Sequence, residues 1–178
     1  MIRNSADAYG SISKLLHWSI ALLIIGLIVL GVWMVTLTYF DPWYNQSLEW
    51  HKALGMIALG VVIVKAGWVL YSPAPELPNF VGGWQRAAAK VTHVLLFVMM
   101  FLIPVTGYLI STSAGQGVSV FGLVDIPVLV SKNERMRDIA TALHDWLAYG
   151  TAVLVLAHAG AALKHQFVDR DGLLRRML

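Results

Sequence analysis

The sequence contains no cysteine and little charge. The absence of cysteine from all 178 residues excludes disulfides, iron–sulfur ligation, covalent attachment of a c-type haem and thiolate catalysis. Charged residues make up 13% of the chain, against roughly a quarter in a typical soluble domain. Hydrophobic residues make up 58%, and the mean hydropathy is +0.68. This composition predicts an integral membrane protein, and the length predicts one transmembrane domain covering residues 1–178.

Four apolar stretches have about the 20 residues that a helix needs to cross a bilayer. They cover about 15–38, 50–71, 91–112 and 141–163. Because backbone polar groups in lipid must bond within their own segment, each stretch should be a helix, and the fold class should be an all-α integral membrane four-helix bundle. The connection 113–140 contains the apolar run VSVFGLVDIPVLV, broken by Gly122 and Pro127. We expect it to be a loop lying over the bundle, and we expect no signal peptide at the polar N-terminus.

Lysine and arginine near the span ends predict the orientation, because such residues are enriched on the cytoplasmic side. One side of the predicted bundle carries Arg3, Lys14, Arg86, Lys90, Lys164, Arg170, Arg175 and Arg176. The other carries only Lys52, Lys132, Arg135 and Arg137. The first side should therefore be cytoplasmic, with both termini inside, and the second periplasmic.

The six histidines are concentrated in the predicted spans, where an imidazole is costly without a partner. They are His17, His51, His93, His144, His158 and His165, and only the last lies beyond a span. His144 and His158 are 14 residues apart, which is about 40° short of four helical turns, so they face the same side. Their separation along the helix axis should be about 21 Å. One helix thus offers an imidazole to the bundle interior near each face of the membrane.

Each of these two imidazoles has a candidate partner at its own depth. His51 is the one other histidine at the depth of His144, because it lies near the periplasmic start of its span. His158 could pair with His17 or with His93. Two imidazoles facing across a bundle are the axial ligands of a b-type haem or of another metal. Zinc and copper sites favour carboxylate or thiolate ligands, which we do not expect in the interior of the spans. We therefore predict two b haems, each held by two histidines.

Small residues near these histidines could make room for a flat macrocycle, although they could equally serve close helix packing. They are Gly26, Gly31, Gly55, Ala157, Gly160 and Ala161. Lys65 follows His51 by 14 residues and shares its face near the cytoplasmic side. It could neutralise a haem propionate, hydrogen-bond a quinone, or extend to the lipid headgroups.

Several motifs resemble the bacterial cytochrome b561 family over nearly the whole chain. They include LLHW at 15–18, HKALG at 51–55, LHDWLAYG at 143–150, IPVTG, and AHAGAALKH followed by a basic LLRRM tail. The family consists of small four-helix proteins of the bacterial inner membrane with two b haems.

The resemblance implies a role for each histidine. His17 and His158 would hold the cytoplasmic-side haem, and His51 and His144 the periplasmic-side haem. His165, together with Lys65, would bind ubiquinone near the cytoplasmic face. For His93 we expect a supporting hydrogen bond to a propionate or to a ligand.

The implied activity is an oxidoreductase that passes electrons from superoxide to ubiquinone. A family member with that activity is thought to attract its anionic substrate with positive charge. Here the four basic periplasmic residues face six acidic ones, which are Asp41, Glu49, Asp125, Glu134, Asp138 and Asp145. The summed charge does not favour such a funnel, although Lys52 beside His51, or Arg135 and Arg137, could make a local one.

Two other functions stay open. The first is a cytochrome b membrane subunit that exchanges electrons between quinol and a periplasmic redox protein, docked at the 113–140 connection. The second is a haem carrier or sensor, which two haems at opposite depths disfavour because sensing needs only one.

Overall fold

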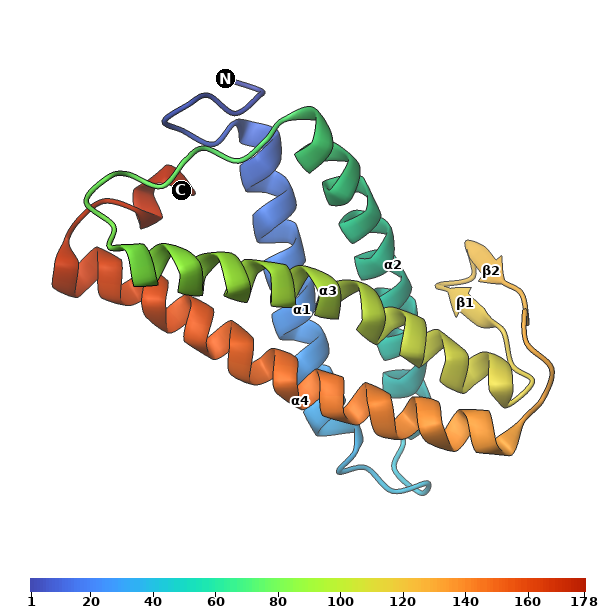
Figure 1. Cartoon of the computed structure of the whole chain (residues 1–178). Helices are drawn as coiled ribbons and strands as arrows, with labels where there is room; N and C mark the ends of the chain where they lie inside the picture. The colour runs from blue at the N-terminus through green and yellow to red at the C-terminus, as the bar shows by residue number, and fades with distance from the viewer.

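Four long helices form the molecule. Figure 1 shows the computed structural model, which describes all 178 residues. The helices are α1 (Ser11–Met34), α2 (Tyr44–Tyr71), α3 (Gly83–Ser113) and α4 (Glu134–Lys164). Each is long and apolar enough to cross a membrane. The predicted all-α, four-helix membrane bundle is confirmed.

The helix ends depend on polar residues that hydropathy does not weigh. The first helix ends at Met34, short of the predicted residue 38. In the connection that follows, Asp41 accepts hydrogen bonds from the backbone N–H and hydroxyl of Thr38 at 2.6 and 2.8 Å. The fourth helix begins at Glu134, before the predicted residue 141. Asn133 caps it, because the Asn133 side chain accepts the N–H of Met136 at 2.9 Å.

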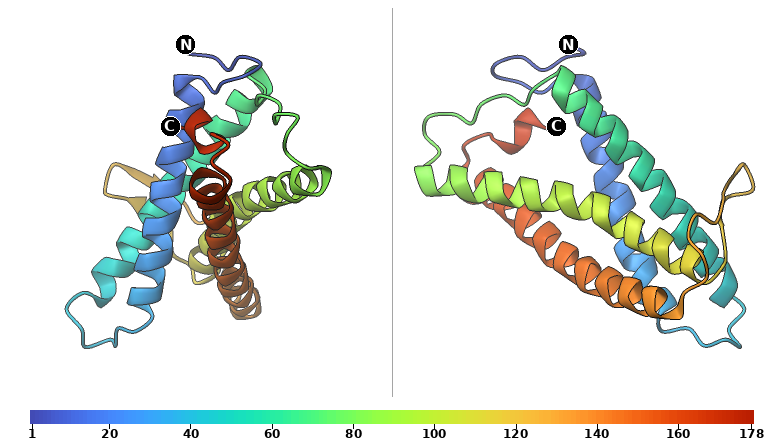
Figure 2. Two further views of the ribbon diagram at one scale, coloured as in Figure 1. Left: turned by 90° about the vertical axis from the view of Figure 1, so that its left-hand side faces the viewer. Right: turned by 45° about the vertical axis from the view of Figure 1, so that its right-hand side comes forward.

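The helices form two antiparallel pairs that cross at a wide angle. Figures 1 and 2 show α1 beside α2 and α3 beside α4, with the pairs meeting near their middles and separating on either side. A buried core of Ile20, Ile24 and Val62 lies at the crossing, and Met100 and Val155 from the second pair pack against it. The closest packing between the two pairs is therefore at this crossing.

Most of the outer surface is apolar. Only 18 of the 178 residues are buried, and side chains in the middle of helices, such as Leu22 (71% exposed) and Leu156 (73%), lie on the outside. A monomeric soluble protein rarely exposes so large an apolar surface. This surface is the one that a membrane protein presents to lipid.

Both termini lie at the same end of the bundle, next to the connection between α2 and α3 (Figure 1). Segments far apart in the sequence are joined there by hydrogen bonds. The Asn4 amide donates to the carbonyl of Ser72 at 2.9 Å, and the Trp18 indole N–H donates to the carbonyl of Met177 at 2.9 Å. We call this end the terminal end and the other the distal end.

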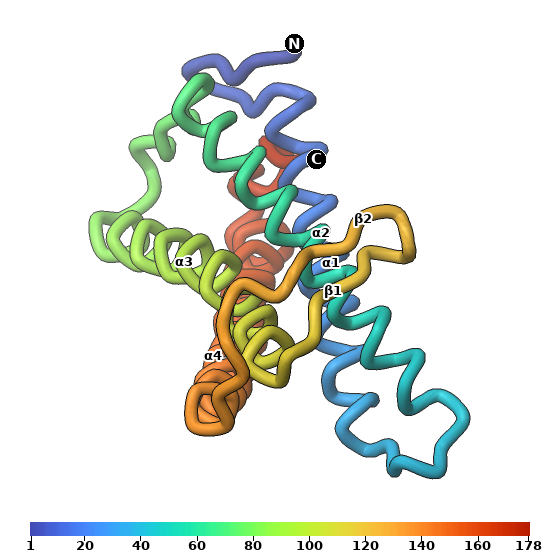
Figure 3. The backbone as a smooth tube through the Cα atoms, turned by 90° about the vertical axis from the view of Figure 1, so that its right-hand side faces the viewer, coloured from blue at the N-terminus to red at the C-terminus, as the bar shows by residue number.

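The connection between α3 and α4 contains a short β-hairpin that the sequence did not predict. Strands β1 (Val118–Val120) and β2 (Val124–Ile126) pair antiparallel, and β1 packs against α2. Figure 3 shows the hairpin beside α2. The prediction that this connection is not a fifth span is confirmed.

Candidate functional site

His51 of α2 and His144 of α4 face each other at the distal end. Their ring centres are 6.1 Å apart and the ring planes are inclined by 75°. Both rings are half-buried. The structure thus brings together two histidines that are far apart in the sequence.

Hydrogen bonds to α3 set the orientation of His144. Its Nδ1 lies 3.0 Å from the carbonyl oxygen of Ile103 and 3.1 Å from the hydroxyl of Thr106. A carbonyl can only accept, so the Nδ1 nitrogen carries the proton and donates it to Ile103. The Nε2 nitrogen keeps its lone pair, which is the state in which a histidine binds a metal.

Two glycines let these imidazoles lie directly against neighbouring helices. A Cβ atom on Gly31 of α1 would lie 3.3 Å from Cε1 of His51, and one on Gly107 of α3 would lie 3.1 Å from Cε1 of His144. The Nδ1 of His51 is buried and has no hydrogen-bond partner in the chain. Buried polar atoms are rarely left without a partner, so water or another group that the chain does not supply is needed at this nitrogen.

A second group of histidines lies toward the terminal end. His158 of α4 has its ring centre 6.2 Å from that of His17 of α1 and 5.2 Å from that of His93 of α3. Lys65 of α2 is close enough to act electrostatically on all three imidazoles, and no carboxylate forms an ion pair with it. All four helices therefore contribute a nitrogen-bearing side chain to this group.

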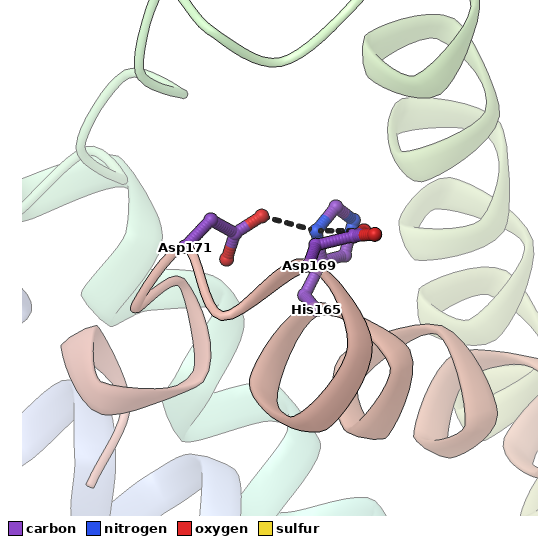
Figure 4. A group of neighbouring side chains, drawn as sticks. All are labelled: His165, Asp169 and Asp171. Carbon is purple, nitrogen blue, oxygen red and sulfur yellow. Dashed lines mark hydrogen bonds and ion pairs between the residues drawn. The ribbon is translucent and has the colours of Figure 1, made fainter.

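His165 lies just beyond α4, in a different setting from the other histidines. Residues His165–Asp169 form one π-helical turn, which ends where Arg170 takes the left-handed conformation with φ of 54°. Such turns are frequent at functional positions. Figure 4 shows His165 with Asp169 and Asp171. The His165 ring makes no contact with the ring of another histidine.

Carboxylates fix the His165 ring. Its Nδ1 lies 2.5 Å from a carboxylate oxygen of Asp171 and 3.3 Å from one of Asp169, which also pairs with the Lys164 ammonium at 2.6 Å. Burial raises the pKa of Asp171, but hydrogen bonds from the Leu173 backbone N–H and from His165 outweigh it and leave that pKa below its ordinary value. Asp171 is thus an anion at neutral pH, and it holds the proton of His165 on Nδ1.

Sequence reasoning missed the residues that support the histidines. Ile103, Thr106 and Gly107 belong to the IPVTG motif, and Asp171 opens the C-terminal DGLLRRM segment. The sequence marks IPVTG and the LLRRM tail only as motifs that resemble the family. The contacts to His144 exist because α3 packs beside α4.

Comparison with known proteins shows the family of the chain. The family model described as "Prokaryotic cytochrome b561" matches residues 8–178. The chain belongs to this family. Cytochrome b561 homolog 2 of Escherichia coli (strain K12) is 41% identical over 176 residues, which cover 98% of this chain and 93% of that protein.

More distant relatives are also cytochromes b561 or carry an enzyme name. Cytochrome b561 homolog 1 of the same E. coli strain is 30% identical over 95 residues, or 53% of each chain. The probable superoxide oxidase CybB of Yersinia pestis is 26% identical over 139 residues, covering 78% of this chain and 77% of that protein. Membership in the cytochrome b561 family establishes electron transfer across a membrane and implies a b-type haem.

The residues present fit such a haem. Two imidazoles that bind one metal ion from opposite sides, through bonds of about 2 Å each, have ring centres about 6 Å apart. The His51–His144 separation of 6.1 Å and the His17–His158 separation of 6.2 Å both match that value. The His93–His158 separation of 5.2 Å is shorter than it.

The contact of Gly107 with His144 yields a direct test. Where His144 holds a haem, as we propose, a Gly107→Ala substitution should displace its imidazole and weaken haem binding by about 10-fold, the lower end of what disturbed support of a metal ligand costs. Haem titration of the apoprotein measures this change in haem affinity. Gly60→Ala is the matched control, because a Cβ at Gly60 meets nothing within 4 Å. Equal haem affinity in both variants would contradict the support role of Gly107.

Proposed function

We propose that this cytochrome b561 carries electrons between the periplasmic face and ubiquinone through two b haems. His51 and His144 would hold one haem at the distal end, and His17 and His158 the other toward the terminal end. The observation that carries the proposal is that the ring centres of the two histidine pairs are 6.1 and 6.2 Å apart. Each pair includes one histidine of α4. When bound, the haems supply one-electron redox centres near the two faces of the membrane.

The proposed roles of the other nitrogen-bearing residues follow from their surroundings. The Lys65 charge is not balanced by any carboxylate of the chain, so it suits the anionic propionates of a haem held by His17 and His158. His93 is too close to His158 to replace His17 without rearrangement, so we assign it a supporting hydrogen bond.

The quinone site is proposed at His165, with Lys65 as the second residue that the resemblance to the family assigns to it. Because Asp171 keeps one proton on Nδ1, Nε2 is the nitrogen that faces the quinone: it donates to a quinone oxygen when it carries a second proton, and it accepts from a quinol hydroxyl when it does not. Reduction of ubiquinone to ubiquinol takes two electrons and two protons. The His165–Asp171 pair lies outside the hydrophobic part of α4, where it can exchange protons with water.

The orientation is part of the proposal. Eight lysine and arginine residues lie toward the terminal end and four toward the distal end, so both termini should be cytoplasmic in the bacterial inner membrane. Quinone reduction would then take its protons from the cytoplasm, and the electron donor would act on the periplasmic side.

For the donor we propose superoxide, in the reaction of two superoxide ions, one ubiquinone and two protons to two dioxygen and one ubiquinol. The similarity to the probable superoxide oxidase of Y. pestis supports it, at 26% identity. The acidic balance of the periplasmic surface opposes it, because like charge slows the approach of an anion. That balance keeps open the second function, electron exchange between quinol and a periplasmic redox protein.

One measurement separates these two functions. The oxidised protein is supplied with a steady flux of superoxide while its visible spectrum is followed. We expect the haem bands to become reduced and to be reoxidised by added ubiquinone, and superoxide dismutase should abolish the reduction. Haems that stay oxidised under superoxide but are reduced by ubiquinol would exclude the superoxide oxidase activity and favour a periplasmic partner.

A further inference from the structure

The tip of the β-hairpin is a small apolar surface that no helix covers. Phe121, Leu123 and Val124 at the tip are 51%, 86% and 58% exposed, and Gly122 lies between the first two. At its base, in contrast, Val118 is 2% exposed and β1 packs against α2. The hairpin is therefore anchored to the bundle at one end and presents apolar side chains at the other.

The hairpin lies alongside α2. Figures 1 and 3 agree that α2 extends past the hairpin toward the connection with α1. The same helix exposes apolar side chains of its own, among them Ile57 and Ile63. The tip thus continues the apolar outer surface that the helices present to lipid.

Polar residues limit how deep the hairpin can lie. Ser119 and Asp125 are paired across the two strands, and both are exposed. Every residue between them is apolar. The outer edges of a two-stranded sheet also carry unpaired N–H and C=O groups, which do not occur in contact with the hydrocarbon interior. These features fit the boundary between headgroups and acyl chains, with the Ser119–Asp125 pair toward water.

We infer that residues 120–124 insert into the lipid leaflet at the distal end and serve as an interfacial anchor for the connection between α3 and α4. The partner of this surface is the lipid boundary itself. The anchor would hold the start of α4 in place relative to α2, the two helices that carry His144 and His51. The inference does not depend on the identity of the electron donor or acceptor.

Because the chain has no cysteine, a single introduced cysteine carries the only thiol. Leu123→Cys is labelled with a nitroxide, and the protein is reconstituted into phosphatidylcholine vesicles. Ser119→Cys and Lys132→Cys, at exposed polar positions of the same connection, are the matched controls. Power saturation by paramagnetic resonance then compares relaxation by oxygen, which concentrates in lipid, with relaxation by a water-soluble nickel chelate.

For the label at residue 123, the ratio of relaxation by oxygen to relaxation by the nickel chelate should be several-fold larger than for the label at residue 132. The label at residue 119 should give an intermediate ratio. A ratio at residue 123 equal to that at residue 132 would place the tip in water and overturn the inference. Protection of residue 123 from both reagents would also overturn it, because the tip would then be covered by protein. An unchanged visible spectrum in each labelled variant shows that the bundle is intact.

Discussion

On the proposed two-haem arrangement, replacement of His144 by alanine should remove one haem and leave the other bound. The substitution deletes the imidazole that faces His51 at 6.1 Å but leaves the His17–His158 pair, on the other side of the helix crossing, untouched. His51 alone would then not hold a haem at the distal end, and the low-spin signal that two-histidine ligation would give there should be lost. Haem content per protein should fall by about half, and one of two low-spin signals in the paramagnetic resonance spectrum should disappear.

The reciprocal variant gives the control. His158→Ala should remove the other signal and spare the one that His144→Ala removes. His93→Ala should keep both, because the His93–His158 separation of 5.2 Å is too short for two imidazoles on one metal ion. Loss of a low-spin signal in His93→Ala, with full retention in a His17→Ala variant, would show that α3 rather than α1 supplies the second ligand at that end.

The histidine pairs could be predicted because helical periodicity relates residues within one span. The spacing of 14 residues between His144 and His158 puts both on one face of α4, and the end of each span gives the depth. Periodicity does not say which helices lie next to each other. The choice between His17 and His93 as the partner of His158 therefore stayed open on the residues alone, and only the resemblance favoured His17.

Contacts that depend on the crossing of the helix pairs were not predictable from the sequence. The carbonyl of Ile103 is an ordinary backbone group, and its bond to His144 exists because α3 and α4 pack along their length. The same packing brings Gly107 against His144. The hairpin was missed for a different reason: strands of three residues are too short for an alternating pattern to be recognised.

Replacement of His165 by alanine should slow quinone reduction strongly while both haems stay bound. His165 lies beyond the hydrophobic part of α4 and makes no ring contact with the two histidine pairs, so its loss should leave their spectra unchanged. Asp171→Asn should have a smaller effect in the same direction, about 10- to 100-fold, which is the usual cost of removing the carboxylate that orients a functional histidine. The rate at which ubiquinone reoxidises the pre-reduced protein measures both.

Asp169→Asn separates orientation of the imidazole from a general loss of negative charge. Asp169 lies farther from Nδ1 of His165, at 3.3 Å against 2.5 Å for Asp171, and it is also paired with Lys164. Its loss should therefore slow reoxidation much less than the loss of Asp171. Equal slowing in the two variants would mean that the summed charge matters rather than the Asp171 hydrogen bond. Haem loss in His165→Ala would mean that His165 supports a haem, and the proposed quinone site would have to be moved elsewhere.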